Sequence, residues 1–458
     1  MLKGVKSIHF IGIGGIGMSG LAKVLLEKGY LISGSDQRKN IFTEQLEKMG
    51  ATIYRGHSAS YLTQPDLVVV SSIIPPCNPE FQKAKKKGIP VVLRGTLLAY
   101  LVNRKEAIII AGTHGKTTTS SFVWSLLHQT GEDPTVFIGG EVDDFGNNSK
   151  LGNSKYVVVE SDESDGSFLL LSPKISILTS LEDDHLDYYG SKNKLMQAFV
   201  QFAMKLKPGG TLIINKDDSC LNKVLTSISL SSSQKLITYG INSPADLSAN
   251  NIKLDQFSSF YEVNYHKKNM GSINLSLPGK YNIYNSLAGI AVGLNLRIEW
   301  EKIRKAFFFF SGVKRRFELI GEKSGILVLD DYAHHPTEIK VTLEAAIRLK
   351  RRIITIFQPH RYSRTKILLS KFATAFQKTD ILLLTEIYPA GEDPIPGIDG
   401  RLLFKKVKEK RKKETHYLST FQEIINFLKR ECCKGDLILT LGAGDINEVG
   451  RSFLRRGE

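Results

Sequence analysis

A short glycine-rich segment, Gly112-Thr113-His114-Gly115-Lys116-Thr117-Thr118, could bind phosphate. It follows an apolar run that is typical of a buried strand, and it precedes a helical pattern that extends to Leu127. Glycines at such a turn let backbone N–H groups approach phosphate oxygens, and the start of the helix adds partial positive charge. Lys116 would contact the terminal phosphates and Thr117 would offer a hydroxyl to Mg²⁺. Two residues separate the glycines where the standard loop has four, so we predict a shortened phosphate loop.

Acidic residues and one histidine follow two later apolar runs. Residues 156–159 lead directly into Glu160, and residues 175–179 lead into a segment that contains His185. Parallel strands place their carboxyl ends on one edge of a sheet, which is where open α/β folds bind ligands. Mg²⁺ prefers oxygen ligands, so we predict Glu160, and with it His185, as metal ligands beside the phosphate loop. The other acidic side chains between Asp162 and Asp187 are expected to be solvated.

A second glycine pattern lies near the N-terminus. Gly12, Gly14 and Gly17 have the spacing of a dinucleotide-binding loop after a strand, and Asp36 follows at the expected distance. A dehydrogenase is one interpretation of this pattern, but it leaves the glycine-rich segment at 112–118 without a role. The same physics binds any pyrophosphate, including that of a sugar nucleotide.

The elements that must position these groups alternate between short β-branched runs and longer helical patterns. That rhythm predicts an α/β chain of three domains with mostly parallel sheets. We expect a Rossmann-like domain at 1–105, a central domain like the P-loop ATPases at 106–313, and a Rossmann-like domain at 314–458. Residues 257–270 alternate weakly and predict an edge hairpin in the central domain. Four consecutive phenylalanines at 307–310 are expected to pack between domains.

Composition narrows the class of protein further. The chain is 42% hydrophobic and 24% charged, and no apolar run approaches the ~18 residues of a membrane span. The four cysteines have neither disulfide nor zinc spacing, so we expect free thiols and a cytoplasmic protein. The net charge of +16 leaves open a nucleic-acid ATPase or a nucleotide-binding regulator. Much of the excess lies in a lysine-rich run at 405–413, which we interpret as a solvated helix face.

With these residues assembled, the sequence resembles the Mur ligases of peptidoglycan synthesis over nearly its whole length. The loop at 112–118 resembles the shortened phosphate loop of that family, and the segment 160–165 resembles its acidic motif. Further blocks of similarity lie at 184–185, 282–285, 315–318 and 330–336. The resemblance implies an ATP-dependent ligase that needs Mg²⁺ and joins a carboxylate to an amine through an acyl phosphate.

The blocks at 12–20 and 358–365 are similar to the family member that adds L-alanine to the lactyl carboxylate of UDP-N-acetylmuramate. Small-molecule substrates are therefore expected, with no nucleic acid and no membrane span, and homo-oligomer formation is left open. The main alternative is the recycling ligase of the same family, which attaches a preformed peptide to the same sugar nucleotide.

The resemblance also implies roles for individual residues. The implied catalytic residues are Lys116, Glu160, His185, Arg316, Asp331 and His335, and the implied metal ligands are Thr117, Glu160 and His185. The implied ATP-binding residues are Gly112, Thr113, His114, Gly115, Lys116, Thr117, Thr118, Asn282, Asn285 and Arg316. The implied UDP-sugar residues are Gly12, Gly14, Gly15, Gly17, Asp36, Ser71 and Ser72, and the groups for the amino acid and its carboxylate are His334, Arg361 and Arg364.

Overall fold

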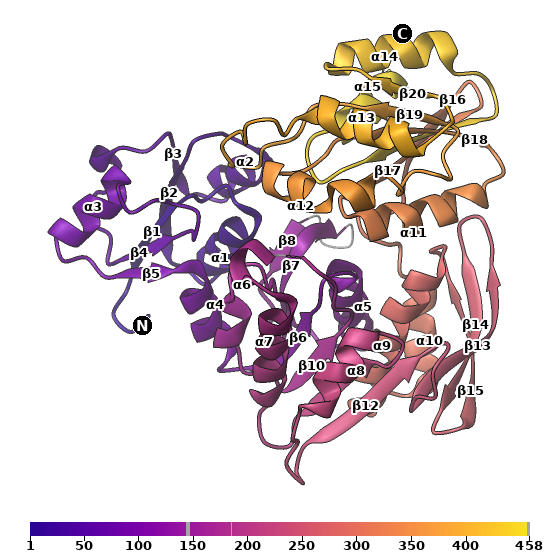
Figure 1. The fold of residues 1–458 in the computed structure, drawn as a ribbon. Coiled ribbons are helices and arrows are strands. Elements are labelled where there is room, and N and C mark those ends of the chain that lie inside the picture. The colour runs from indigo at the N-terminus through magenta and orange to yellow at the C-terminus, as the bar shows by residue number, and fades with distance from the viewer. Residues whose placement is uncertain (143–146, 185, 456–458) are drawn as a thin grey trace. The chain divides into compact units, whose positions relative to one another are not determined.

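The computed structural model describes residues 1–142, 147–184 and 186–455. Its strands form three sheets of five, ten and six strands (Figure 1). The described chain forms two compact units, of which the first holds the first two sheets and the second holds the third sheet. The predicted α/β class with mostly parallel sheets is confirmed, whereas the domain boundaries at 105 and 313 stay predictions.

The first sheet has the strand order β3-β2-β1-β4-β5, and every neighbouring pair is parallel. This is the order of a Rossmann-like half-fold with its switch point between β1 and β4, beside the first glycine loop. Helices α1, α2 and α4 pack on one face, and α3 packs on the other. The strands are β1 (Ser7–Ile11), β2 (Leu31–Asp36), β3 (Thr52–Arg55), β4 (Leu67–Val70) and β5 (Val91–Leu93). The helices are α1 (Ile16–Glu27), α2 (Ile41–Lys48), η1 (Ala59–Tyr61), α3 (Pro79–Lys86) and α4 (Arg94–Val102).

The middle sheet has the strand order β15-β14-β13-β12-β11-β10-β6-β9-β7-β8. Its centre is parallel, and only β7 and β8 pair antiparallel among the pairs whose register is described. Because β6, β9 and β10 run side by side, their carboxyl ends share one edge. The strands are β6 (Glu106–Ala111), β7 (Thr135–Val142), β8 (Asn147–Lys150), β9 (Tyr156–Glu160), β10 (Ile175–Leu178), β11 (Thr211–Asn215), β12 (Lys235–Gly240), β13 (Leu247–Leu254), β14 (Ser259–Tyr265) and β15 (Lys268–Leu275).

Helix α5 begins at Lys116, directly after the phosphate loop, and residues 117–127 are all buried. A helix that is apolar or small on every side must be buried all round. The helices of this domain are α5 (Lys116–Gln129), η3 (Ser167–Leu170), α6 (Leu186–Tyr189), α7 (Lys192–Met204), α8 (Ser219–Thr226), α9 (Lys280–Asn295) and α10 (Trp300–Phe308).

Two sequence predictions for this domain have clear outcomes. The edge hairpin is confirmed as β14 and β15, joined at His266 and Lys267, which both have positive φ as a tight hairpin turn requires. In the phenylalanine run, Phe307 and Phe310 are buried and their rings lie 4.9 and 4.2 Å from the ring of Phe122 in α5. These contacts lie inside the middle domain, which differs from the predicted packing between domains. Phe307 lies in the last turn of α10 and Phe310 lies just beyond its end, and both rings pack against α5.

The third sheet has the strand order β16-β17-β21-β18-β19-β20 and is parallel except for the β16–β17 pair. Apolar clusters cover both of its faces. The strands are β16 (Glu318–Lys323), β17 (Ile326–Asp331), β18 (Arg352–Phe357), β19 (Ile381–Leu384), β20 (Thr415–Tyr417) and β21 (Asp436–Leu441). The helices are α11 (Pro336–Ile347), α12 (Tyr362–Phe372), α13 (Gly400–Lys410), α14 (Phe421–Glu431) and α15 (Asn447–Arg455). Among the described residues of the whole chain, no helix is both long and apolar enough to cross a bilayer.

Candidate active site

The phosphate loop lies at the carboxyl edge of the middle sheet, between β6 and α5, and the end of β10 fixes its shape. The backbone N–H of Thr113 donates to the Ser180 carbonyl at 3.0 Å, and the N–H of His114 donates to the Ser180 hydroxyl at 2.9 Å. Gly112 has φ of +141°, and a Cβ there would lie 2.2 Å from the hydroxyl oxygen of Thr179. Only glycine fits this position, so the loop is shaped before any ligand binds.

Lys116 is the first residue of α5, and its ammonium group is already bound within the loop. It donates to the Gly112 carbonyl and to the carboxylate of Glu163, whose oxygen lies 2.9 Å away. Burial alone would lower the pKa of Lys116, but the negative charges of Glu163 and Asp162 raise it above its ordinary value. The lysine is therefore a permanent positive charge. Only 2% of the Glu163 side chain is exposed, so the expectation that the carboxylates beyond Glu160 are solvated is wrong for this residue.

Glu160 ends β9 and points back to the phosphate loop. One carboxylate oxygen accepts from the Thr117 hydroxyl at 3.0 Å, and the other accepts from the backbone N–H of Gly139 at 2.6 Å. Mg²⁺ prefers oxygen ligands. The Glu160 carboxylate and the Thr117 hydroxyl, whose oxygens are 3.0 Å apart, could both coordinate one ion. Thr117 and Glu160 therefore fit the predicted metal ion, whereas His185 lies outside the described residues.

Helix α9 contributes two buried amides to this edge. Asn285 packs under the loop, where its side-chain oxygen accepts from the Thr119 hydroxyl at 3.3 Å. A Cβ on Gly115 would lie 2.4 Å from that same oxygen. Asn282 is 4% exposed and lies one turn earlier in α9. Both predicted asparagines therefore lie in the helix that packs against the phosphate loop.

The start of α9 is anchored by Asp217, which follows β11. Its carboxylate accepts from the Tyr284 hydroxyl at 2.7 Å and from the backbone N–H groups of residues 241–243 at 2.7–2.8 Å. Burial would raise the pKa of Asp217, but these hydrogen bonds lower it to about 2. A deprotonated Asp217 thus fixes Tyr284, which lies between the two asparagines.

The first glycine loop joins β1 to α1. The backbone N–H of Gly14 donates to the Asp36 carboxylate at 2.9 Å, so Asp36 holds the loop. Ser71 packs against Gly12, where a Cβ on the glycine would lie 3.3 Å from the serine side chain. In the first turn of α1, the N–H of Met18 donates to the Gly15 carbonyl at 3.0 Å. The N–H groups of Ile16 and Gly17 precede the first carbonyl that the helix could offer them, so they could bind a phosphate.

Two contacts link this loop region to the acidic motif of the middle domain. Ser72 donates to Asp165 at 3.4 Å, and Arg94 donates to the same carboxylate at 3.3 Å. The Arg94 guanidinium also lies 3.2 Å from where a Cβ on Gly17 would be. Arg94 therefore places a positive charge beside the start of α1. No sequence motif had singled it out.

In the second unit, Arg316 and Asp331 lie together near the end of β17. Asp331 is 5% exposed and accepts from the backbone N–H groups of Phe317 and Ala333, each at 2.8 Å. Burial raises the pKa of Asp331 to about 6, although the charge of Arg316 and those two donors oppose the shift. The guanidinium of Arg316 stacks 5.2 Å from the ring centre of Tyr332.

A cluster of histidines and arginines lies at the start of α11 and α12. His335 is the N-cap of α11, where its Nδ1 accepts from the N–H of Thr337 at 3.3 Å. His334 is hydrogen-bonded to the Tyr332 carbonyl at 3.0 Å. These contacts fix both rings, and His335 is 1% exposed.

His360, which was not singled out from the sequence, lies among the arginines. Burial, together with the nearby positive charges, lowers its pKa to about 2, and Arg364 donates to its Nδ1 at 3.2 Å. The ring is therefore neutral and adds no charge of its own beside the two guanidinium groups. Arg361 caps α12 with φ of +71°, a strained value for a residue with a side chain. Arg361 and Arg364 thus form a positively charged cluster that suits a carboxylate ligand.

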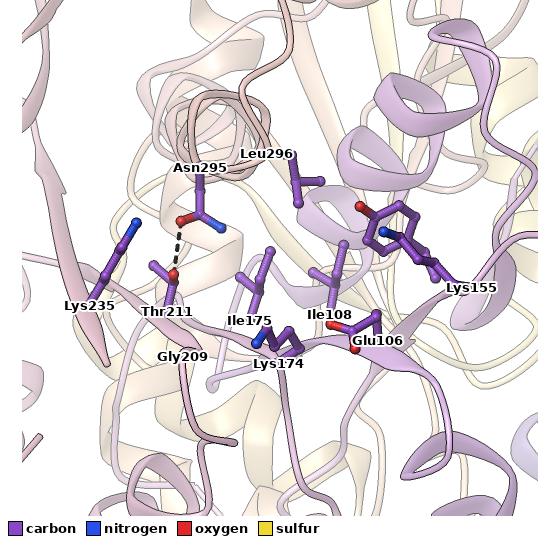
Figure 2. Close-up of a pocket in the computed structure, with 11 residues that line it drawn as sticks. Glu106, Ile108, Lys155, Lys174, Ile175, Gly209, Thr211, Lys235, Asn295 and Leu296 are labelled. Carbon is purple, nitrogen blue, oxygen red and sulfur yellow. Dashed lines mark hydrogen bonds between the residues drawn. The ribbon is translucent and has the colours of Figure 1, made fainter. Parts of the chain in front are cut away.

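The described chain also has a cavity of ≈ 260 Å³ at the opposite, amino edge of the middle sheet (Figure 2). It is lined by Lys174, Ile175 and Thr211, the last of which donates to Asn295 at 2.8 Å. None of the residues predicted for the active site lines this cavity.

These features define a three-domain α/β protein in which the glycine loop predicted to bind phosphate lies at a sheet edge. Family models match three consecutive segments: the Mur ligase family catalytic domain at 7–106, the Mur ligase middle domain at 110–293 and the Mur ligase glutamate ligase domain at 315–444. The chain belongs to the Mur ligase family.

Three relatives indicate where it stands in that family. A UDP-N-acetylmuramate–L-alanine ligase of Trichlorobacter lovleyi is 44% identical over 100% of both chains. The structure of UDP-N-acetylmuramate-alanine ligase from Thermotoga maritima has a TM-score of 0.85 at 30% identity, covering 98% of each chain. A murein peptide ligase from Psychrobacter arcticus gives 0.74 at 27% identity with the same coverage.

Proposed function

We propose that this protein is an ATP-dependent ligase that joins L-alanine to the lactyl carboxylate of UDP-N-acetylmuramate. The observation that carries the proposal is the full-length identity of 44% to a UDP-N-acetylmuramate–L-alanine ligase. The contact between Thr117 and Glu160 beside the glycine loop supports it. The cytoplasmic location stays a prediction.

In the proposed reaction, a lactyl carboxylate oxygen attacks the γ-phosphorus of ATP and ADP leaves. The uncharged amine of L-alanine then attacks the acyl carbon, so that an amide forms, phosphate leaves and the amine loses a proton. Lys116 would neutralise charge on the transferred phosphoryl group, which two approaching anions require. When bound, Mg²⁺ would supply further positive charge to the phosphate oxygens, held by Thr117 and Glu160.

The remaining residues support binding. Asn282 and Asn285 would position the nucleotide from α9, and the first-turn amides of α1 would bind the pyrophosphate of the sugar nucleotide. The segment that leads from β17 into α11 carries Asp331, His334 and His335. Arg316 precedes β16 and places its charge near Asp331. Arg361 and Arg364 would bind carboxylate groups. We also propose the three domain spans 1–105, 106–313 and 314–458 as sugar-nucleotide, ATP and amino-acid domains.

The proposal is tested by phosphate release from the purified full-length chain. We expect release only when ATP, UDP-N-acetylmuramate, L-alanine and Mg²⁺ are all present, and loss of release with excess EDTA. Glu160→Gln should raise the Mg²⁺ concentration needed for half-maximal rate by about tenfold, since one charged ligand is lost. Equal release without the amino acid would contradict the proposal.

The recycling ligase is the second candidate, because a murein peptide ligase shares the fold over 98% of the chain. A comparison of L-alanine with the tripeptide L-alanyl-D-glutamyl-diaminopimelate as acceptor separates the two. Preferential turnover of the tripeptide would favour the recycling activity.

Stimulation of ATP hydrolysis by DNA or RNA would instead support the nucleic-acid ATPase that the charge of +16 left open.

A further inference from the structure

A buried polar network lies beneath the first sheet and has no part in the chemistry above. Glu80 of α3 is its centre and is 0% exposed. One carboxylate oxygen contacts His9 Nε2 at 2.6 Å, and the other accepts from the Ser35 hydroxyl at 2.8 Å and contacts His57 Nδ1 at 2.9 Å. His9 is also 0% exposed, and its second ring nitrogen is 2.8 Å from the Ser33 hydroxyl.

The network favours an ionised Glu80. Burial would raise the pKa of this carboxyl group, but the hydrogen bonds from His9 and Ser35 outweigh it and the pKa is lowered. Glu80 also lies in the first turn of α3, where the helix dipole stabilises negative charge. A buried charge is costly unless it is paired, and an apolar residue would pack beneath a sheet at less cost. Stability alone therefore does not explain why a charged Glu80 occupies this buried position.

Ser35 connects this network to the first glycine loop. Its hydroxyl binds Glu80, while its carbonyl accepts from the backbone N–H groups of Gly12 at 2.8 Å and Ile13 at 3.1 Å. The next residue, Asp36, accepts from the N–H of Gly14. The end of β2 thus holds three consecutive amides of the loop. Glu80 fixes the side of Ser35 that faces away from them.

We propose that Glu80 is a positioning residue for the sugar nucleotide: through Ser35 it sets the path of residues 12–14, and with it the first-turn amides of α1. The inference rests on the proposed function of this loop. Within the described part of the chain, the Glu80 carboxylate has its hydrogen-bond partners in His9, Ser35 and His57 and none in residues 12–14. Its effect should therefore be specific to one of the three substrates.

The test is Glu80→Gln in the full chain, with initial rates measured against each substrate in turn. An amide keeps the shape but loses the charge and one acceptor. We expect the KM for UDP-N-acetylmuramate to rise about tenfold, as for a lost charge-assisted hydrogen bond. We expect kcat and the KM for ATP to stay within about twofold. Glu44→Gln, on the exposed surface of α2, is the matched control and should change none of these values.

A purely structural role would lower the melting temperature and the amount of active protein, while every KM stayed at the parent value. That result would overturn the proposal. Should Glu80→Gln fail to fold, Ser35→Ala removes the linking hydroxyl and keeps the carbonyl, and it should raise the same KM in the same direction.

Titration calorimetry with UDP alone gives a second readout that does not need turnover. UDP should bind the Glu80→Gln chain about tenfold more weakly than the parent. If the parent binds UDP but does not catalyse ligation, the proposed function fails and the calorimetric comparison still decides this inference. Equal UDP affinities in the two proteins, or no UDP binding by the parent, would overturn the inference.

Discussion

The ion pair between Lys116 and Glu163 makes a quantitative prediction about the ligand-free protein. Replacing Lys116 with Met keeps the aliphatic part of the side chain and removes the ammonium group. Glu163, with 2% exposure, is then left buried beside Asp162 without its partner at 2.9 Å. Breaking a buried pair from one side costs about 3–5 kcal/mol. Because 14% of the Lys116 side chain reaches solvent, we expect the low end, about 3 kcal/mol of unfolding free energy.

Thermal unfolding and urea denaturation at neutral pH measure this cost. A loss of about 3 kcal/mol lowers the melting temperature of a domain of this size by about 6–12 °C. Adding Glu163→Gln to the Lys116→Met variant should return much of the lost stability, because the buried negative charge is gone. Ligase activity should stay absent in both variants, since the phosphate contact is missing. If Lys116→Met alone is as stable as the parent, the reasoning about the buried ion pair is refuted.

Three further predictions follow from single positions. Gly115→Ala places a methyl group against Asn285 at a backbone φ of +80°, which strains the loop. The KM for ATP in a rate assay should therefore rise at least about tenfold. A KM equal to that of the parent would contradict the steric argument. Asp217→Asn should destabilise the protein at neutral pH by about 1 kcal/mol after screening. Because the folded pKa of Asp217 is about 2, that difference should shrink in melting curves as pH falls from about 4 toward 2, and a constant difference would argue against a charged anchor for Tyr284. Arg361→Gly should raise the melting temperature, because it relieves about 1 kcal/mol of backbone strain at the start of α12. The same change should raise the KM for L-alanine. A lowered melting temperature would count against strain at this position.

The sheets and the phosphate loop could be predicted from the sequence because their signals are local. The strand that ends at Ala111 is a run of β-branched and small residues, and the glycines that follow it need special backbone conformations. Glu160 was found for the same reason, since it is the charged residue that ends an otherwise apolar strand.

Contacts between distant segments could not be predicted in this way. Glu163 lies in an acidic stretch whose composition suggests solvation, and only the fold brings it to Lys116. His360 and Arg94 are similar cases, since their neighbours come from other elements. The phenylalanine run was placed between domains because its pattern shows that some rings are buried but not against which partner.

The burial of α5 on all sides has a consequence for motion during turnover. Residues 117–127 have no face in water, and the ring of Phe122 is enclosed by those of Phe307 and Phe310. Shifting or tilting such a helix would open voids along its whole length, which close-packed interiors resist. The loop that we propose for the triphosphate therefore precedes a helix that does not shift. We expect conformational changes in the catalytic cycle to involve other segments and side chains such as Lys116.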